Sequence, residues 1–352
     1  MEDKSKLIGF TCAYTPLALI DAAGFVPYRI LPMGDWPDQA GQILHENLCP
    51  HIKRILDRAM QDDIPDLSGI VFMNSCDAMR RLSDAWQKVR PNDNTVLIDL
   101  PISKDDRSVS FFADELNRFA ERLSQWGGND IRPEGVENSI GRYNELAIHL
   151  NELKKRVNLG TLKDGSTRLQ AIYNKAVTEP IENVLELIKQ IAGEPDVIAD
   201  NALPIYIFGN VLPDPEVFTL FESCGARIVG EDLCTGSRMI NVIEIENNDK
   251  SLDGFKGLAR ATLSRPACAR TIDPSNPGKM IHDVVEKAKA SNARGVIGHI
   301  IKFCDPYLAR LPSVREALKK EGLSFLLLEG DCTMRSIGQH KTRIEAFIEM
   351  LR

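Results

Sequence analysis

The sequence predicts an α/β protein made of two doubly wound parallel sheets with a helical layer between them. Three observations support this prediction. The chain has 352 residues, which is longer than a single hydrophobic core usually grows, so two domains are expected. Short continuous apolar runs alternate with helical patterns, as is typical of parallel strands covered on both faces. This alternation occurs twice, on either side of a stretch that contains helical patterns only.

The first series of strands and helices occupies residues 1–135 and predicts an N-terminal α/β domain. Its first helix is well delimited, because Thr15 and Pro16 suit the N-cap and first position, and Gly24 suits the residue after the helix. Strands are predicted at 7–11, 26–31, 70–73 and 96–100, and helices at 15–23, 47–61 and 77–89.

Residues 136–200 are predicted to form a helical linking segment, and 201–352 a C-terminal α/β domain that repeats the first. The long helical patterns lie at 106–128, 137–157 and 180–192. The second series has predicted strands at 204–210, 226–233, 296–301 and 324–328, with helices at 214–224, 279–290, 313–321 and 337–351. The segment from 235 to 278 is expected to be less regular.

Composition and charge exclude several classes of partner. The net charge is −7, and Lys and Arg are interspersed with acidic residues, so no nucleic-acid partner is expected. No apolar run reaches the roughly 18 to 20 residues that span a bilayer, so no membrane partner is expected. The first residues lead straight into a strand without a targeting segment, which predicts a cytoplasmic protein.

The cysteines are the most informative residues of the chain. In open α/β sheets, ligands bind beyond the carboxyl ends of the strands. Cytoplasmic thiols are kept reduced, so these cysteines are expected to be core fillers or ligands, not disulfides. Thiols gathered at strand ends predict a soft-metal site, such as an iron–sulfur cluster. Five of the eight stand where a predicted strand ends: Cys12, Cys76, Cys234, Cys304 and Cys332.

The local context separates the cysteines further. Helix N-termini lower thiol pKa values and favour anions, so the cysteines that precede helix or turn starts are candidate ligands, with simple packing as the alternative. These are Cys12, Cys76 and Cys304. Cys224 stands at a helix end before a turn and is expected to pack as a small apolar side chain. The context decides less for the remaining four, Cys49, Cys234, Cys268 and Cys332.

Other reactive motifs are absent from the sequence. There is no GxSxG elbow, no phosphate loop and no GxGxxG after a strand, which disfavours an ATPase or a dinucleotide-dependent dehydrogenase. The six histidines show no HxxxH spacing. The cysteine spacing also differs from ferredoxin runs and from zinc CxxC pairs, so the ligands of any cluster would come from distant strand ends.

With these residues in view, the chain resembles the 2-hydroxyacyl-CoA dehydratase D-component family, which also includes benzoyl-CoA reductase subunits and double-cubane-cluster proteins. The resemblance extends over nearly the whole chain. Its motifs are CAYTP (12–16), IDAAG (20–24), NSCDAMRR (74–81), GARIV (225–229), EDLCTGSR (231–238), KFCDPY (302–307) and GQHKTRIEAF (338–347).

The resemblance implies two flavodoxin-like domains with an oxygen-sensitive [4Fe-4S] cluster between them, held by Cys12, Cys76 and Cys304. It implies an iron–sulfur subunit of a 2-hydroxyacyl-CoA dehydratase, paired with a homologous second subunit or with a second copy of itself. In this family an ATP-dependent iron–sulfur activator protein supplies a low-potential electron. A ketyl radical of the acyl-CoA substrate then expels the 2-hydroxyl group. The resemblance identifies neither a catalytic residue nor the acyl group.

Three alternatives stay open. A benzoyl-CoA-reductase-like or double-cubane reductase would use the same electron for reduction, a non-catalytic subunit would only relay electrons, and a cluster-free protein would simply bury its thiols. Cys332 departs from the family pattern. The chain has enough thiols for a double-cubane [8Fe-9S] cluster, namely Cys12, Cys49, Cys76, Cys234, Cys268 and Cys304.

Overall fold

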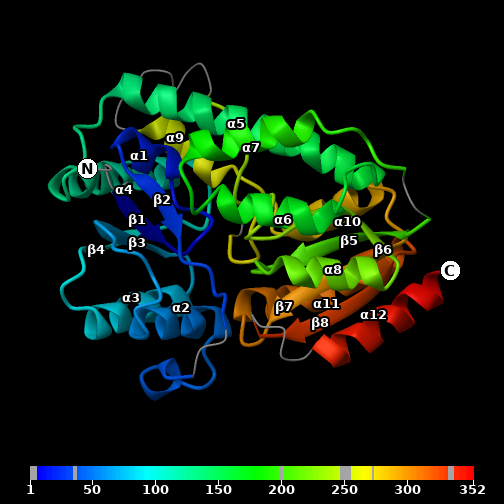
Figure 1. Ribbon diagram of the computed structural model, residues 1–352. Helices are drawn as coiled ribbons and strands as arrows, with labels where there is room; N and C mark the ends of the chain where they lie inside the picture. Colours follow the sequence, from blue (N-terminus) through cyan, green and yellow to red (C-terminus); the bar gives the residue numbers. More distant parts are fainter. Residues whose placement is uncertain (1–5, 35–37, 199–200, 246–254, 272, 332–336) are drawn as a thin grey trace.

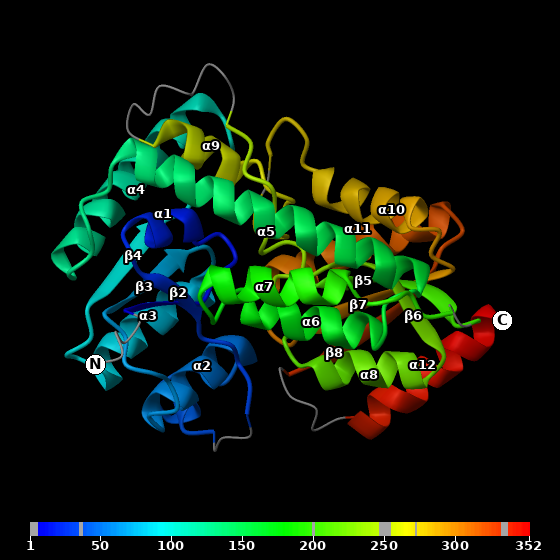
Figure 2. The ribbon, with the colours of Figure 1, turned by 45° about the horizontal axis from the view of Figure 1, so that its top comes forward.

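The computed structural model confirms the predicted fold class and describes residues 6–34, 38–198, 201–245, 255–271, 273–331 and 337–352. Two four-stranded sheets of parallel strands lie in separate halves of the molecule, and helices surround both (Figure 1). The long helix α5, Pro133–Leu159, runs across both halves in two different views (Figure 1, Figure 2).

The first sheet consists of β1 Leu7–Phe10, β2 Val26–Arg29, β3 Gly69–Asn74 and β4 Thr95–Asp99, in the order β2-β1-β3-β4. Its helices are α1 Leu17–Ala22, α2 Pro50–Met60, α3 Asp77–Val89 and α4 Asp106–Gln125, with a short 3-10 turn at Ala40–Gln42. Successive side chains of a strand point to opposite faces. Val71 and Met73 therefore pack with α1 and α4, whereas Ile70 and Phe72 pack with α2 and α3.

The second sheet repeats this arrangement. Its strands are β5 Leu203–Gly209, β6 Ala226–Asp232, β7 Gly295–Ile301 and β8 Ser324–Gly330, in the order β6-β5-β7-β8. Apolar residues of α8 Pro215–Ser223 and α12 Ile337–Leu351 cover one face, and those of α10 Lys279–Ala290 and α11 Asp305–Lys320 cover the other. Both halves are thus doubly wound parallel sheets, as the two series of apolar runs predict.

The helical layer consists of α5, α6 Gly165–Lys175 and α7 Ile181–Ala192. Apolar side chains of all three helices belong to the same core as Ile8 and Phe10 of the first sheet. At the same time, α5 and α6 contact β6 of the second sheet. The layer therefore packs against both sheets and connects the two halves.

Three elements differ from the sequence-based expectation. Helix α6 was not predicted, and α9, Lys256–Leu263, lies in the segment expected to be less regular. Helix α9 packs against α4 of the first half. Helix α11 begins at Asp305, not at 313, because Pro306 occupies a favourable first-turn position and the helix continues through Pro312. The buried side chains of Tyr307, Val314 and Leu318 hold both sides of that proline in the core.

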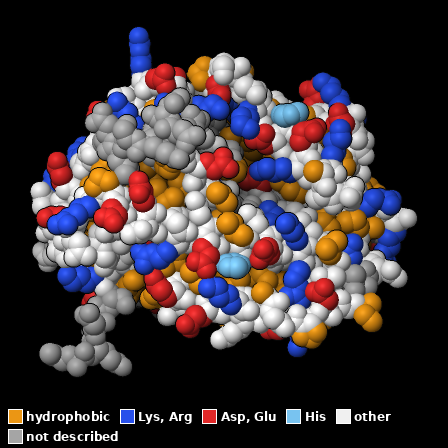
Figure 3. Space-filling view, turned by 90° about the horizontal axis from the view of Figure 1, so that it is seen from above, with side chains coloured by type: hydrophobic (Ala, Val, Ile, Leu, Met, Phe, Trp, Pro, Cys, Tyr) orange, Lys and Arg blue, Asp and Glu red, His pale blue; other side chains and the backbone are white. Residues whose placement is uncertain are grey.

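One face of the described part of the molecule carries charged side chains of both signs. Lys and Arg side chains are interspersed with Asp and Glu on the face seen in Figure 3. None of the described helices combines the length and the apolar character that a membrane span requires.

Candidate metal centre

A cavity of about 100 Å³ lies between the two sheets. Its wall includes residues that follow the carboxyl ends of β1, β3, β5 and β7, namely Cys12, Cys76, Val211 and Cys304. In each sheet these are the two neighbouring strands between which the strand order reverses. Open α/β sheets bind their ligands at this switch point. The cavity therefore combines the expected ligand positions of both sheets.

Six of the seven described cysteines line this cavity: Cys12, Cys49, Cys76, Cys234, Cys268 and Cys304. The set contains the three predicted cluster ligands together with the three further thiols that a double-cubane cluster would need. Cys224 lies apart from them, at the end of α8 in an apolar core of the second half, as its context predicts. Cys332 lies outside the described residues.

Three of the cavity cysteines are N-cap residues: Cys49 of α2, Cys76 of α3 and Cys304 of α11. Ser, Thr, Asp and Asn are the usual residues at this position, so cysteine there suggests a role other than capping. The first turn of each helix places the positive end of its dipole beside the thiol, which favours a thiolate. Three helices therefore offer a ligand and a favourable field to the same cavity.

Burial opposes ionisation of most of these thiols. It raises the pKa of Cys49 to about 12 and that of Cys76 to about 11, and it raises the pKa of Cys12 and Cys304 as well. Cys234 differs, because its hydrogen bond with Cys268 and the charge of Arg238 lower its pKa in spite of burial. Among the thiols of the cavity, Cys234 is therefore the one whose ionisation its surroundings favour.

One buried arginine, Arg29, and one partly buried arginine, Arg270, give the wall positive charge without a carboxylate partner among the described residues. Arg29 is 1% exposed, donates from Nη1 to the carbonyl oxygen of Cys234 at 2.6 Å, and leaves its Nε unpaired. Arg270 donates to the carbonyl oxygens of Leu100 at 2.6 Å and Pro101 at 2.9 Å. Burial lowers the pKa of both groups, and among the described residues the charges that oppose this shift belong to cysteines and Tyr14. Buried charges need a partner, so this wall favours an anionic group in the cavity.

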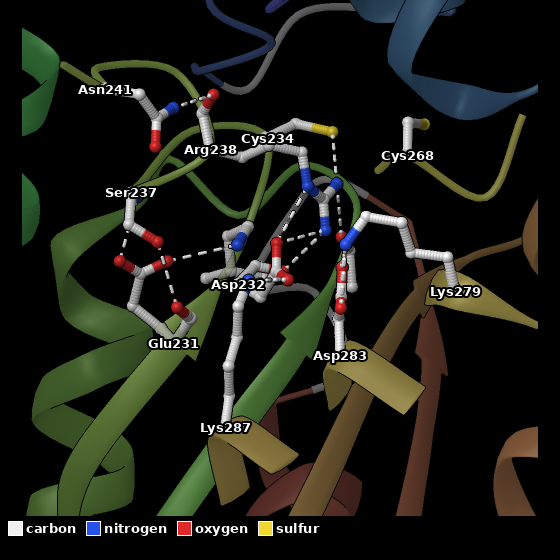
Figure 4. A network of polar contacts seen from close by, with 12 residues as sticks. Glu231, Asp232, Cys234, Ser237, Arg238, Asn241, Cys268, Lys279, Asp283 and Lys287 are labelled. Carbon is white, nitrogen blue, oxygen red and sulfur yellow. Dashed lines mark hydrogen bonds and ion pairs between the residues drawn. The ribbon is translucent and has the colours of Figure 1, made fainter. Parts of the chain in front are cut away.

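A third arginine is fixed by an ion-pair network below Cys234 (Figure 4). Arg238 donates from Nε to Asp232 Oδ1 at 2.8 Å and from Nη1 to Cys234 Sγ at 3.1 Å. Lys287 donates to the other oxygen of Asp232 at 2.8 Å. Burial would raise the pKa of Asp232, but the charges of Arg238 and Lys287 outweigh it and lower the pKa to about 2. The carboxylate is therefore charged and holds the guanidinium against the thiol.

The donor set fits a cluster better than a single ion. Within the described ranges, no three Cys, His, Asp or Glu side chains converge closely enough to hold one metal ion. A cluster has no such requirement, because each of its irons takes its own thiolate. The thiols at several strand and helix ends, next to Arg29 and Arg270, are the residues that would hold such a cluster.

The sequence-based analysis missed the polar residues that surround the thiols: Arg29, His51, Arg238 and Arg270. Arg238 lies in the EDLCTGSR motif, four residues after Cys234, and this spacing was a usable signal. Arg29 ends a strand that is otherwise apolar or aromatic, which was a weaker signal. His51 follows Cys49 by two residues, but no spacing rule for histidine pairs could single it out.

The fold and the cavity define a class: α/β proteins of two similar halves with a thiol-lined cavity between their sheets. A family model described as 2-hydroxyglutaryl-CoA dehydratase, D-component, matches residues 12–351, and the chain belongs to this family.

Similar proteins are known from several bacteria. The chain is 25% identical to the (R)-phenyllactyl-CoA dehydratase beta subunit of Clostridium sporogenes, over 98% of this chain and 92% of that protein. It is 26% identical to the lactoyl-CoA dehydratase beta subunit of Anaerotignum propionicum, over 98% and 91% of the two chains. It is 24% identical to a benzoyl-CoA reductase subunit of Thauera aromatica, over 91% and 84%. The relatives are thus subunits of dehydratases and of a reductase.

Proposed function

We propose that the chain is the iron–sulfur subunit of a 2-hydroxyacyl-CoA dehydratase-type enzyme. Such an enzyme eliminates water from a 2-hydroxyacyl-CoA with the help of a low-potential electron from an ATP-dependent activator protein. The observation that carries this proposal is that six thiols line one cavity, in a chain whose relatives are named as dehydratase beta subunits. Their names also support a partner, which is a homologous second subunit or a second copy of this chain.

Cys12, Cys76 and Cys304 would hold a [4Fe-4S] cluster between the domains. All three line the cavity and belong to both halves of the chain. When bound, a cluster held by three thiolates supplies low-potential electrons and one iron that is open to a further ligand.

The protein supplies charge, orientation and exclusion of water. Arg29 and Arg270 offset negative charge in the cavity, because their own guanidinium groups have no carboxylate partner among the described residues. Arg238 fixes the side chain of Cys234. The rest of the cavity wall includes the apolar side chains of Ile52, Met79, Val211 and Ile301. These side chains keep the local dielectric constant low, which strengthens the interactions between charges.

A double-cubane reductase is the second candidate function, and one observation favours it. Cys49, Cys234 and Cys268 line the same cavity as the three first candidates, which gives the six thiolates that an [8Fe-9S] cluster would use. A benzoyl-CoA-reductase-like activity belongs with this candidate, since one relative is named as a benzoyl-CoA reductase subunit. The same cluster without a substrate would make the chain an electron-relay subunit.

Substrate binding separates these functions. The chain is purified without oxygen, reconstituted with iron and sulfide, and titrated with a 2-hydroxyacyl-CoA and with benzoyl-CoA, with free coenzyme A as the control. We expect the absorption and EPR spectra of the reduced cluster to change with the 2-hydroxyacyl-CoA but not with coenzyme A. A response to benzoyl-CoA alone would favour the reductase. A cluster that responds to neither thioester would support the relay function and contradict the dehydratase.

A further inference from the structure

His51 is a buried imidazole in the cavity wall whose polar atoms lack partners. It is the second residue of α2, lines the cavity and is 4% exposed. Neither Nδ1 nor Nε2 makes a hydrogen bond to the described part of the chain. A buried polar group without a hydrogen bond costs about 1–3 kcal/mol, and native structures contain few of them. This orphaned side chain therefore requires a functional explanation.

Most other wall side chains with an oxygen or sulfur atom that could bind a metal already take part in hydrogen bonds. The Sδ of Met79 accepts a hydrogen bond from Thr11 at 3.4 Å, and the hydroxyl of Tyr307 donates to the carbonyl oxygen of Gly209 at 2.6 Å. The side-chain oxygen of Asn210 accepts from the backbone N–H of Ile301 at 3.1 Å. The remaining hydroxyls are in contact with neighbours as well, Tyr14 with Thr271 and Ser75 with Cys12. Apart from Arg29, whose guanidinium does not bind metal, His51 is the described wall residue with buried side-chain nitrogen or oxygen atoms that make no hydrogen bond.

Both ring nitrogens of His51 are available to a metal. A neutral imidazole binds metal through the lone pair of one ring nitrogen. Because neither nitrogen of His51 is used by a hydrogen bond to the described residues, this buried ring can ligate a metal in the cavity that it lines.

We propose that His51 is a nitrogen ligand of the cluster, at the iron that the thiolates of Cys12, Cys76 and Cys304 leave open. This inference rests on the proposed function. His51 and Cys49 lie two residues apart at the N-terminus of α2, so one helix end presents a nitrogen and a sulfur donor to the cavity. A neutral imidazole adds no negative charge, and histidine in place of cysteine raises the reduction potential of a cluster.

The test uses pulsed EPR of the reduced, reconstituted chain. We expect a strong hyperfine coupling from a directly bound imidazole nitrogen in the unaltered protein. Growth on [15N]histidine should convert that coupling to the 15N pattern, and this arm needs no mutation. His51→Ala should abolish the coupling. His299→Ala is the matched control, because His299 is also buried, at 6% exposure, and does not line the cavity.

The outcomes separate this inference from the proposal on which it rests. A cluster with full iron content and no histidine coupling in the unaltered chain overturns ligation by His51 and leaves the proposed function intact. Coupling that persists in His51→Ala also overturns it. Failure of the unaltered chain to assemble any cluster overturns both.

Discussion

Arg238 donates a hydrogen bond to the Sγ of Cys234 across 3.1 Å, and Asp232 holds the same guanidinium from the opposite side. The arginine is 3% exposed and its charge is paired, so it can lie permanently against the sulfur. The ring of Tyr307 lies 5.9 Å from its central carbon. This relationship makes Cys234 unlike the other thiols of the cavity.

Cys234 should be the first cavity cysteine to react in the metal-free protein. Its pKa is lowered by the contact with Cys268 and by Arg238, whereas those of Cys49 and Cys76 are raised to about 12 and about 11. Since the thiolate is the nucleophile, iodoacetamide at pH 7 should label Cys234 before the others, as mass spectrometry of tryptic peptides would show. Arg238→Met should slow this labelling. Arg315→Met is the control, because Arg315 lies on α11 outside the cavity, and Cys234 of this variant should be labelled at the unaltered rate. Equal labelling of all six thiols would contradict the assignment.

Asp232→Asn should destabilise the metal-free protein by about 3–5 kcal/mol, because it leaves the buried charge of Arg238 without its carboxylate. Urea denaturation at pH 7 measures the free energy of unfolding. The matched control is Asp283→Asn, which removes the ion pair with the half-exposed Lys279 and should cost less than about 1 kcal/mol. Equal losses in the two variants would show that the network at Asp232 carries no special share of the stability.

Cys76→Ala and Cys304→Ala should each abolish the cluster, because two remaining thiolates hold a cubane poorly. Iron analysis and the visible absorption of the reconstituted variants measure this loss. Cys224→Ala is the control, since that thiol packs in the core of the second half, and its iron content should be unchanged. Iron that survives the loss of Cys304 would exclude this residue from the ligand set.

His299 should make the protein less stable in acid. Burial and the neighbouring His340 lower its pKa from 6.5 to about 4, against the opposing charge of Asp331. In the unfolded chain, His299 is therefore protonated as the pH falls below 6.5, whereas in the folded chain it stays neutral until about pH 4. The stabilising contribution is fully present above pH 6.5 and falls by about 3 kcal/mol as the pH drops through this window.

His299→Asn removes this titration. The difference in unfolding free energy between the unaltered protein and the variant, followed from pH 7.5 to 4.5, should shrink or reverse as the pH falls. A difference that stays constant over this range would mean that His299 titrates alike in both states.

The fold and the thiols of the site were predictable because both leave local patterns. Buried parallel strands appear as continuous apolar runs, and cysteines after such runs point to the ligand edge of the sheet. The three predicted cluster ligands, Cys12, Cys76 and Cys304, do line one cavity. The three further thiols that a double-cubane cluster would need line the same cavity. Whether they bind iron stays a prediction.

The charged residues of the cavity wall and some of the helices could not be predicted, because contacts between distant parts of the chain determine them. Arg29, at the end of β2, donates a hydrogen bond to the carbonyl oxygen of Cys234, which lies far along the chain, and no local pattern indicates this contact. Helix α9 is short, and its packing against α4 stabilises it. Pro312 signals a helix boundary locally, but burial of its neighbours Tyr307 and Val314 keeps α11 continuous.

The most direct test of the central claim is the amount of iron and acid-labile sulfide per chain after anaerobic purification and reconstitution. We expect a brown protein with about four irons and four sulfides per chain, the content of one cubane. About eight irons per chain would instead assign the six thiols to a double-cubane cluster. A colourless protein that retains neither iron nor sulfide would contradict the account, because the thiols of the cavity would then only be packed.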